Sequence, residues 1–339
     1  MSDSFWERRS VFVTGATGLL GGWLVPALVR KGAQVVALIR DGSPRSVLVQ
    51  EGWLGRIATV QGSLEDYGLI RRTLAEYSVD TTFHLAAQTL VGIAKEDPIG
   101  TLEANVQGTW NLLEAARTTR KCQVLVASSD KAYGEPRSLP YEEDHPLCGK
   151  YPYDVSKSCV DLISRMYATT YRLPVGIVRC GNLFGGGDLN FSRSIPGLIA
   201  STLRGDRFQI RSDGHYVRDF LYVEDAVAAY MLTAEKLAAD DSLIGEAFNF
   251  SLESRLTVLQ LVDLVLGIMN RADLNPVILN RASDEVREQY LTAAKAKRLL
   301  GWSPQFSMEE GLRRSIQWYQ AYLEKMEAVK GTSRRAVGA

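Results

Sequence analysis

Cysteine and histidine are scarce in this sequence. Its 339 residues include only four cysteines and three histidines. The cysteines show neither CxxC spacing nor an accompanying histidine cluster, which argues against a zinc site and against a disulfide framework; they are Cys122, Cys148, Cys159 and Cys180. We therefore expect free, buried thiols, which suit a reducing cytoplasm, and no bound metal ion.

An excess of either charge is also missing. The chain has 39 basic and 39 acidic residues and no long basic run. Nucleic acids and anionic membrane surfaces attract proteins mainly through excess positive charge, so we expect neither as the main partner. The opening MSDSFWERRS has no apolar core of signal-peptide length, and no later window has the ~18 uninterrupted apolar residues of a membrane span. The expectation is a cytoplasmic protein with a small-molecule partner.

A regular alternation of strand and helix patterns fills the first two thirds of the chain. Hydrophobic residues make up 46% of the sequence, enough for a large core. Short β-branched runs predict strands at Val11–Thr14, Gln34–Ile39, Ile57–Val60, Thr82–Leu85, Gln123–Ala127 and Val175–Arg179. Helical periodicity predicts helices at Leu19–Lys31, Tyr67–Tyr77, Pro98–Thr119 and Tyr153–Tyr171. This order predicts an α/β fold with a doubly wound, Rossmann-type parallel sheet.

The pattern loosens after residue 180 into the glycine-rich GNLFGGGDLNFSRSIPG, and then mixes short strands such as Ala247–Phe250 with helices. We predict a smaller mixed α/β lobe there, which binds substrate. The expected division is a Rossmann domain at 1–180 that carries the catalytic residues, a lobe at 181–330 with some segments returning to the Rossmann domain, and a flexible tail at 331–339. A final amphipathic helix is expected to end near Glu327.

A glycine-rich loop, VFVTGATGLLGG, joins the first predicted strand to the first helix. Its Gly15, Gly18 and Gly21 have G-x-x-G-x-x-G spacing. Glycines allow a tight turn and the close approach of a pyrophosphate, whose charge then meets the free N–H groups at the helix N-terminus. Such glycines also occur in ordinary βα turns, but the flanking strand and helix favour a dinucleotide site. The spacing is that of the short-chain dehydrogenases.

The end of the second predicted strand bears on which dinucleotide is bound. An acidic residue there accepts hydrogen bonds from the ribose hydroxyls of NAD, whereas an arginine binds the 2′-phosphate of NADP. Arg40 comes first, with Ser43 and Arg45 close behind, which slightly favours NADP. Asp41, an acidic residue at this position, is also compatible with NAD. In a third interpretation, Arg40 and Asp41 are only a solvated charge pair on a loop.

Two further motifs combine acid, base and phenol. Tyr153 and Lys157 in YPYDVSK lie one turn apart on a predicted helix, so an ammonium stands near a phenol and favours its ionised form. The motif SSDKAYG follows the strand Gln123–Ala127 directly and places Asp130 and Lys131 just beyond its end. The carboxyl ends of parallel strands are where ligands bind, so these four side chains are candidate catalytic residues.

With these motifs the chain resembles the extended short-chain dehydrogenase/reductase superfamily, specifically its nucleotide-sugar epimerases and dehydratases. The resemblance covers nearly the whole length and is carried by VTGATGLLGG, HLAAQ, ANVQGT, SSDKAYG, YPYDVSK, RCGNLFGGGD, VRDFLYVEDA and YLTAAKAKRLLGWSPQ. It implies that Ser129 completes a Ser–Tyr–Lys triad and bonds the sugar 4-hydroxyl, whose proton Tyr153 takes as hydride leaves C4.

The resemblance also implies a tightly bound NAD(P)+ that is regenerated in each turnover. Ser63 stands where many relatives carry an aspartate near the adenine, which puts that contact in question. The implied cofactor contacts are Gly15, Thr17, Gly18, Leu19, Leu20, Gly21, Arg40, Asp41, Ser63, Leu64, Leu85, Ala86, Ala87, Gln88, Asn105, Tyr153 and Lys157.

The Asp130-Lys131 pair separates two reactions within this superfamily. Epimerases need only the triad and the cofactor, whereas 4,6-dehydratases add an acid and a base directly after the serine or threonine. Asp-Lys resembles the CDP-glucose enzymes, and Asp-Glu is found in the dTDP-glucose enzymes. We predict a 4,6-dehydratase that yields a 4-keto-6-deoxy sugar nucleotide, with Asp130 as the C6 acid. Lys131 becomes the C5 base once desolvation or a positive neighbour lowers its pKa.

Three alternatives stay open at this point. The pair could belong to an ordinary strand-end turn, with Asp130 as a cap and Lys131 in solvent. The chain could be a nucleotide-sugar 4-epimerase that uses the same triad. It could also be a non-catalytic protein that senses the dinucleotide, although such relatives usually lose the Tyr or the Lys, and both are present.

The resemblance also implies which residues contact the substrate and which quaternary structure the protein has. Asn182 matches an asparagine that touches the sugar-phosphate linkage, and Arg218 and Arg287 match arginines that clamp the diphosphate. Arg211 is a further candidate, and an unpartnered surface arginine is the alternative for each. The helices Pro98–Thr119 and Tyr153–Tyr171 have apolar residues on more than one face. The resemblance implies that they form a homodimer through a four-helix bundle.

Overall fold

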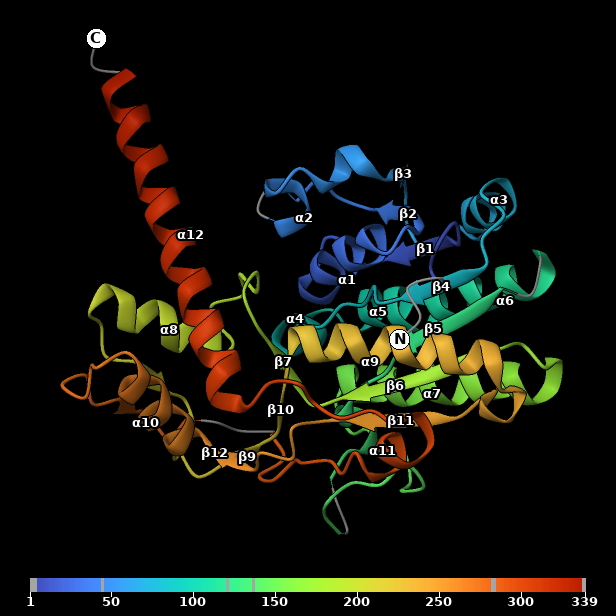
Figure 1. The fold of residues 1–339 in the computed structure, drawn as a ribbon. Helices are drawn as coiled ribbons and strands as arrows, with labels where there is room; N and C mark the ends of the chain where they lie inside the picture. Colours follow the sequence, from blue (N-terminus) through green and yellow to red (C-terminus); the bar gives the residue numbers. More distant parts are fainter. Residues whose placement is uncertain (1–4, 44–45, 120–121, 136–137, 282–284, 337–339) are drawn as a thin grey trace.

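A large parallel sheet forms the centre of the computed structural model, which describes residues 5–43, 46–119, 122–135, 138–281 and 285–336 (Figure 1). Its seven strands lie in the order β11-β6-β5-β4-β1-β2-β3, and all pairs are parallel. They are β1 (Ser10–Thr14), β2 (Gln34–Ile39), β3 (Ala58–Gln61), β4 (Thr81–His84), β5 (Gln123–Ala127), β6 (Val175–Cys180) and β11 (Ala247–Phe250). The predicted doubly wound sheet is confirmed. We predicted six strands, and β11, whose sequence lies in the predicted lobe, adds the seventh.

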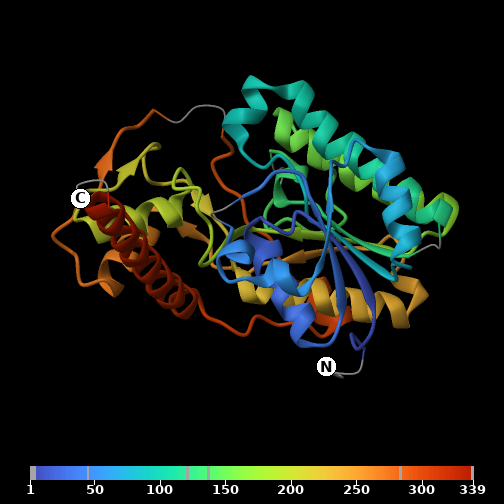
Figure 2. The same cartoon turned by 90° about the horizontal axis from the view of Figure 1, so that it is seen from above.

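Helices cover both faces of this sheet (Figure 2). One face packs against α1 (Leu19–Arg30) and α9 (Val223–Ala239), and the other against α3 (Tyr67–Glu76), α6 (Gly108–Thr119) and α7 (Pro152–Tyr171). Strands covered on both faces have no solvent side, which explains the largely apolar sequences of β1, β5 and β6. The strand order reverses between β1 and β4, which is the point where such sheets form a ligand crevice.

The segment predicted as one helix at Pro98–Thr119 is interrupted. It consists of α5 (Pro98–Leu102), a π-helical turn η2 (Glu103–Gln107) and α6. The wider turn carries Asn105, whose side chain accepts from the backbone N–H of Gln88 at 2.7 Å and donates to the Gln88 carbonyl at 3.1 Å. A π-helical turn replaces the regular hydrogen bonds of an α-helix by less favourable ones. The two bonds from Asn105 to the loop after β4 compensate for this loss.

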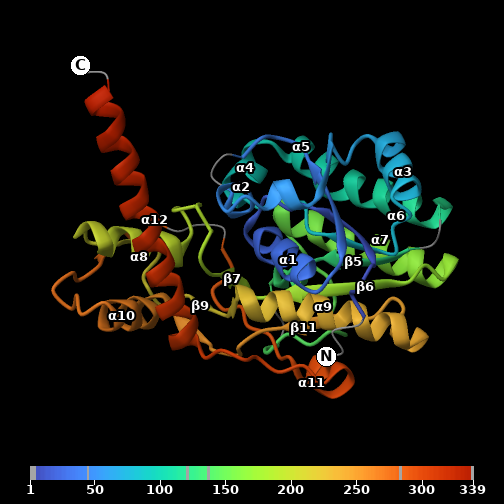
Figure 3. The ribbon, with the colours of Figure 1, turned by 45° about the horizontal axis from the view of Figure 1, so that its top comes forward.

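The smaller lobe lies beside the carboxyl ends of the strands (Figure 3). Its paired strands are β7 (Asn182–Phe184) with β10 (Phe220–Tyr222), β9 (Val217–Arg218) with β12 (Leu256–Thr257), and β8 (Gln209–Ile210) with β13 (Val277–Ile278). Its main helices are α8 (Ser194–Arg204), α10 (Val258–Ile268) and α12 (Met308–Ala336). The remaining elements are α2 (Val47–Gln50), η1 (Trp53–Arg56), α4 (Val91–Glu96), η3 (Asp130–Tyr133), η4 (Asp241–Leu243) and α11 (Ala294–Leu300).

The last helix is longer than the sequence suggested. α12 runs to Ala336, past the expected end near Glu327, and so covers most of the segment 331–339 for which we expected a tail. Residues 337–339 lie outside the described part of the chain. The large sheet ends at Cys180 with β6, and the next strand, β7, belongs to a separate two-stranded sheet, while β11 from the predicted lobe pairs with β6. The division into 1–180 and 181–330 stays a prediction.

The cysteines differ in exposure. All four are free, as expected. Cys122 and Cys180 are buried, whereas Cys148 is exposed and Cys159 is half-buried, so the expectation of buried thiols holds for the first two and fails for Cys148. Across the described ranges, no group of three or more His, Cys, Asp or Glu side chains has the arrangement of a metal site. None of the described helices has the length and apolar character needed to cross a bilayer. The cytoplasmic location stays a prediction.

Candidate active site

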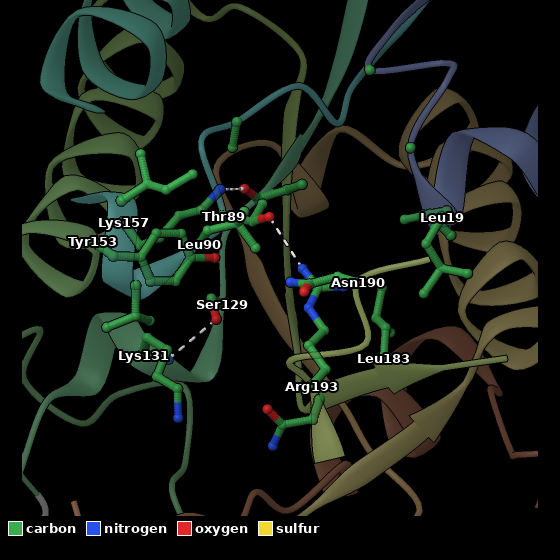
Figure 4. A pocket seen from close by; sticks show the side chains of 18 of the residues that line it. Leu19, Thr89, Leu90, Ser129, Lys131, Tyr153, Lys157, Leu183, Asn190 and Arg193 are labelled. Carbon is green, nitrogen blue, oxygen red and sulfur yellow. Dashed lines mark hydrogen bonds between the residues drawn. The ribbon is translucent and has the colours of Figure 1, made fainter. Parts of the chain in front are cut away.

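A large cavity opens where β1, β4, β5 and β6 end, and the smaller lobe supplies its other wall (Figure 4). Its volume is about 1360 Å³. Pockets that hold one drug-sized ligand typically measure about 300–1,000 Å³. The cavity is therefore large enough for two ligands side by side, such as a cofactor and a substrate.

The glycine loop forms the floor of this cavity near β1. Gly15 has φ +74°, and a Cβ there would lie 2.6 Å from the backbone N of Ala86. A Cβ on Gly21 would lie 2.3 Å from the carbonyl O of Gly15. Gly18 is the N-cap of α1 and no side chain caps that helix, so its first N–H groups are left for a ligand. This cradle of backbone donors fits the diphosphate of a dinucleotide.

Most of the predicted cofactor contacts line the cavity. Gln88 and Asn105 do not: they bond to each other behind the wall, so they position the loop after β4 rather than contact a ligand directly. Those that do line it are Gly15, Thr17, Gly18, Leu19, Leu20, Gly21, Arg40, Asp41, Ser63, Leu64, Leu85, Ala86, Ala87, Tyr153 and Lys157.

The two charges at the end of β2 bind each other. Arg40 Nε lies 2.6 Å from Asp41 Oδ2, and both side chains are largely exposed. This matches the solvated charge pair that the sequence left open. Both residues still line the cavity, so either could meet the ribose of a dinucleotide. Arg45, the other basic residue considered there, lies outside the described residues.

The turn after β5 presents Asp130 and Lys131 to the cavity. Ser129 is the N-cap of η3: its hydroxyl accepts the N–H of Lys131 at 3.3 Å and donates to Asp130 Oδ1 at 3.0 Å. Asp130 is 2% exposed, and its Oδ2 has no hydrogen-bond partner within the described part of the protein. The cap is thus Ser129 rather than Asp130, and the solvent-exposed turn considered above is wrong.

Lys131 points along the cavity wall toward the smaller lobe (Figure 4). Its Nζ donates to Oε1 of Gln289, a side chain that is also buried. Burial lowers the pKa of Lys131, and the guanidinium of Arg218 lowers it further, against the opposing effect of Asp130. The direction of this pKa shift meets the condition that the sequence placed on a lysine base.

Tyr153 and Lys157 project from the first turns of α7. Lys157 Nζ donates to the carbonyl of Ala127 at 2.7 Å and lies 5.9 Å from the centroid of the Tyr153 ring (Figure 4). Burial lowers the pKa of Lys157 to about 8. The pKa of Tyr153 rises to about 12, mainly by burial and also by Asp130, while a hydrogen bond with Ser129 acts to lower it. We expected a lowered phenol pKa, and desolvation outweighs that effect here.

Four of the five predicted substrate contacts reach the cavity: Ser129, described above, and three residues of the smaller lobe. Asn182 lines it and donates to the carbonyl of Asp219 at 3.0 Å. Arg218 and Arg211 also line it. Arg287 is absent from the described lining, and its guanidinium pairs with Asp213 at 3.2 Å. The geometry therefore gives no support to Arg287 as a diphosphate contact.

Sequence reasoning missed other polar groups of the cavity. Arg193 lines it, pairs with the buried Asp188 at 2.9 Å and donates to Thr89 at 3.1 Å across the opening (Figure 4). No spacing pattern marked Arg193 in the sequence. Asp154 also lines the cavity, and here a signal existed, because it follows Tyr153 inside the YPYDVSK motif.

His84, in the HLAAQ motif at the end of β4, has a packing role. Its two ring nitrogens lie 2.9 Å from the hydroxyls of Thr14 and Thr109, and it is buried. Burial, with a contribution from Lys157, lowers its pKa to about 3. The imidazole stays neutral at physiological pH and ties β1 and β4 to α6.

Comparisons with known proteins agree with this geometry. A family model described as GDP-mannose 4,6 dehydratase matches residues 12–315. A CDP-glucose 4,6-dehydratase from Salmonella typhimurium is 30% identical over 339 residues, which covers 95% of this chain and 94% of the relative. A dTDP-glucose 4,6-dehydratase from Xanthomonas campestris pv. campestris is 30% identical over 330 residues, covering 91% of this chain and 92% of the relative.

Solved structures give the same picture. DesIV, a dTDP-glucose 4,6-dehydratase from Streptomyces venezuelae solved with NAD, superposes with a TM-score of 0.82 at 28% identity, covering 92% of this chain and 97% of the other. A UDP-glucose 4-epimerase from Thermotoga maritima superposes with a TM-score of 0.83 at 27% identity, covering 93% and 99%. Sheet, glycine cradle and triad thus define a short-chain dehydrogenase/reductase of the nucleotide-sugar type. Within this class, the chain belongs to the GDP-mannose 4,6-dehydratase family.

Proposed function

We propose that this protein is a nucleotide-sugar 4,6-dehydratase that converts CDP-glucose, or a close relative of it, to the 4-keto-6-deoxy sugar nucleotide. The observation that carries the proposal is the presence of Asp130 and Lys131 in the same cavity as the Ser129, Tyr153 and Lys157 triad. Inversion at C4 breaks no bond at C5 or C6, so an epimerase has no use for this additional acid and base. The similarity to the Salmonella CDP-glucose 4,6-dehydratase supports CDP as the nucleotide part of the substrate.

The cofactor in this proposal is NAD+ or NADP+, held by the glycine cradle, the end of β2 and the Tyr153–Lys157 pair. When bound, it accepts a hydride from C4 of the sugar and returns it to C6 later in the same turnover. DesIV was solved with NAD. The slight preference for NADP that Arg40 suggested stays a prediction, because its guanidinium is already paired with Asp41.

The protein's own groups supply the proton transfers. Tyr153 takes the proton of the sugar 4-hydroxyl, which Ser129 orients by a hydrogen bond. A ketone at C4 makes the C5 proton acidic, and Lys131, whose pKa is lowered by burial, removes it. Asp130 gives a proton to the departing C6 hydroxyl, and its unpartnered Oδ2 is the oxygen free to do so. Asn182, Arg211 and Arg218 line the side of the cavity where we place the sugar diphosphate.

A substrate panel read by mass spectrometry tests this proposal. Incubation with CDP-, dTDP-, GDP- and UDP-hexoses, each with NAD+ and separately with NADP+, is expected to give a loss of one water from CDP-glucose without net consumption of the dinucleotide. The dinucleotide that gives the faster loss of water in this panel is the preferred cofactor. A product of unchanged mass but altered configuration at C4 would favour the epimerase, and unchanged substrate across the panel would refute both reactions.

We also propose that the protein is a homodimer formed by α5, α6 and α7. These helices pack side by side (Figure 2). Large apolar side chains on them are exposed, including Ile99 at 69%, Leu162 at 55%, Trp110 at 44% and Met166 at 43%. Leu162 and Met166 lie one turn apart, on one face of α7. Exposed apolar surface of this kind typically marks a protein interface, and two copies of the helix pair would make a four-helix bundle.

Leu162→Glu is expected to convert the dimer to monomers, because it places a charge in the middle of this apolar face. The mass in solution, measured by light scattering after size-exclusion chromatography, gives the result. Leu299→Glu is the matched control, since Leu299 is an equally apolar helical residue, 44% exposed, on α11. A monomeric wild type, or an unchanged dimer in Leu162→Glu, would contradict this interface.

A further inference from the structure

Gln289 is a buried amide that the steps above do not use. It lines the same cavity as the triad and is 2% exposed. Its Oε1 accepts a hydrogen bond from Nζ of Lys131, the residue proposed to remove the C5 proton. The two residues come from different parts of the fold, because Lys131 lies in η3 and Gln289 lies on a segment that bonds β9 of the smaller lobe. The contact therefore joins the smaller lobe to the catalytic turn.

The backbone around Gln289 is held at two neighbouring points. Its own N–H donates to the carbonyl of Val217 in β9 at 3.2 Å. The carbonyl of the next residue, Tyr290, accepts the N–H of Tyr141 at 2.9 Å. Because both bonds reach into other segments, the side chain of Gln289 starts from a fixed place on the cavity wall.

The two ends of the Gln289 amide can be told apart by their partners. A lysine ammonium only donates hydrogen bonds, so the atom that faces Lys131 is the amide oxygen. The buried hydroxyl of Tyr141 also hydrogen-bonds Gln289, and it donates its own proton to the carbonyl of Gly134 at 2.5 Å. The phenol oxygen is thus left to accept from the amide NH2 group. Both partners require the same orientation of the amide.

Gln289 brings no charge to a lysine that already has charged neighbours. Burial lowers the pKa of Lys131, and Arg218 of β9 lowers it further. Three carboxylates act in the opposite direction, namely Asp130 of η3, Asp154 of α7 and Glu285. A further carboxylate at position 289 would form an ion pair and favour the ammonium, whereas an amide accepts the hydrogen bond without a charge of its own.

We propose that Gln289 is the positioning residue of Lys131 in the dehydration step, an inference that rests on the proposed function. The neutral amine and the ammonium both donate N–H groups, so the amide oxygen holds Lys131 before and after it takes the C5 proton. In the amine, this bond fixes one of the two N–H groups and directs the nitrogen lone pair to the sugar. The C5–H electron pair then forms the C5=C6 double bond, and the C6–O bond breaks as Asp130 protonates the leaving hydroxyl to water.

Gln289→Glu keeps the length of the side chain and an accepting oxygen but adds a negative charge. We expect the pKa of Lys131 to rise by about 1–3 pH units, because an opposite charge in contact favours the ammonium. The readout is the pH dependence of the loss of water from CDP-glucose in single turnovers, followed by mass spectrometry. Below the pKa of Lys131 the rate should fall about tenfold for each pH unit, so this limb of the profile moves to higher pH in the variant.

Gln317→Glu is the matched control. It makes the same change at an exposed residue of α12, and its profile should coincide with that of the wild type.

Gln289→Met removes the accepting oxygen and keeps an unbranched side chain of similar length. We expect the loss of water to slow by about 10²-fold, because the amine is no longer aligned with C5. Oxidation at C4 does not involve Lys131, so the absorbance of the reduced nicotinamide should appear at the wild-type rate and then persist. A merely structural role of Gln289 would slow both steps.

A further measurement needs no substrate. Trace acetic anhydride acetylates neutral amines, so the pH dependence of Lys131 acetylation, read on its peptide by mass spectrometry, gives the pKa of Lys131. We expect this pKa to rise in Gln289→Glu and to stay unchanged in Gln317→Glu.

These measurements separate the possible failures. An unchanged pKa of Lys131 in Gln289→Glu, or an equal loss of both steps in Gln289→Met, overturns the role of Gln289 while the proposed function stands. A wild type that removes water from no sugar nucleotide refutes the proposed function itself, and the positioning role in dehydration falls with it.

Discussion

Asp130→Asn is expected to abolish the loss of water while oxidation at C4 continues. Asparagine keeps the size of the side chain and the oxygen that accepts from Ser129 Oγ at 3.0 Å, but it has no acidic proton for the C6 hydroxyl. Loss of a positioned general acid typically costs about 10²–10⁴-fold in rate. We therefore expect the formation of the dehydrated product to fall by about that factor, with the reduced dinucleotide and the 4-keto sugar accumulating on the enzyme.

Two readouts on one sample make this result specific. Mass spectrometry follows the loss of water, and the absorbance of the reduced nicotinamide follows oxidation at C4. Asp144→Asn is the control, because Asp144 is an exposed residue outside the cavity and its substitution should leave both signals as in the wild type. Dehydrated product formed by Asp130→Asn at the wild-type rate would remove Asp130 from the mechanism. A wild type that gives only an isomer of unchanged mass would make the epimerase the better interpretation.

The predictable part of this site lies in local segments. The glycine loop, SSDKAYG and YPYDVSK each place their side chains through one strand end or one helix turn, so spacing alone indicates which groups face the ligand. Ser129, Asp130, Lys131, Tyr153 and Lys157 all line one cavity, as the motifs suggested. Their catalytic roles stay predictions until the variants are measured.

The unpredicted part depends on contacts between distant segments. Gln289, which bonds the Lys131 ammonium, lies 158 residues further along the chain. Arg193 reaches Thr89 across 104 residues, and its guanidinium also bonds Asp188. The sign of the Tyr153 pKa shift was missed for the same reason, since burial is a property of the folded cavity and not of the YxxxK spacing.

A buried network holds the acid-base turn from behind. Arg179 of β6 is fully buried and bonds both carboxylate oxygens of Asp161 in α7, at 2.7 and 2.8 Å. It also donates to the hydroxyl of Tyr133 in η3 at 2.7 Å, and that hydroxyl donates to Asn249 of β11 at 2.7 Å. One guanidinium thus joins the helix of the triad, the turn of Asp130 and the seventh strand. A buried charge pair is costly to form, and its satisfied geometry fixes the relative positions of these elements.

Tyr153→Phe is expected to stop the reaction one step earlier than Asp130→Asn does. The phenylalanine ring fills the same space, so the cavity wall and α7 should stay intact, but the group that takes the 4-hydroxyl proton is lost. We expect turnover to fall by at least about 10²-fold with no reduced nicotinamide formed, since oxidation at C4 requires that proton to leave.

Tyr171→Phe provides the comparison, because it makes the same change at an exposed residue of the same helix. The two catalytic variants then report on successive steps: one accumulates the reduced dinucleotide and the other never forms it. An active Tyr153→Phe enzyme would mean that another group takes the proton. A wild type that binds the dinucleotide yet shows neither signal with any sugar nucleotide would favour the non-catalytic sensor, because the triad would then be present without its chemistry.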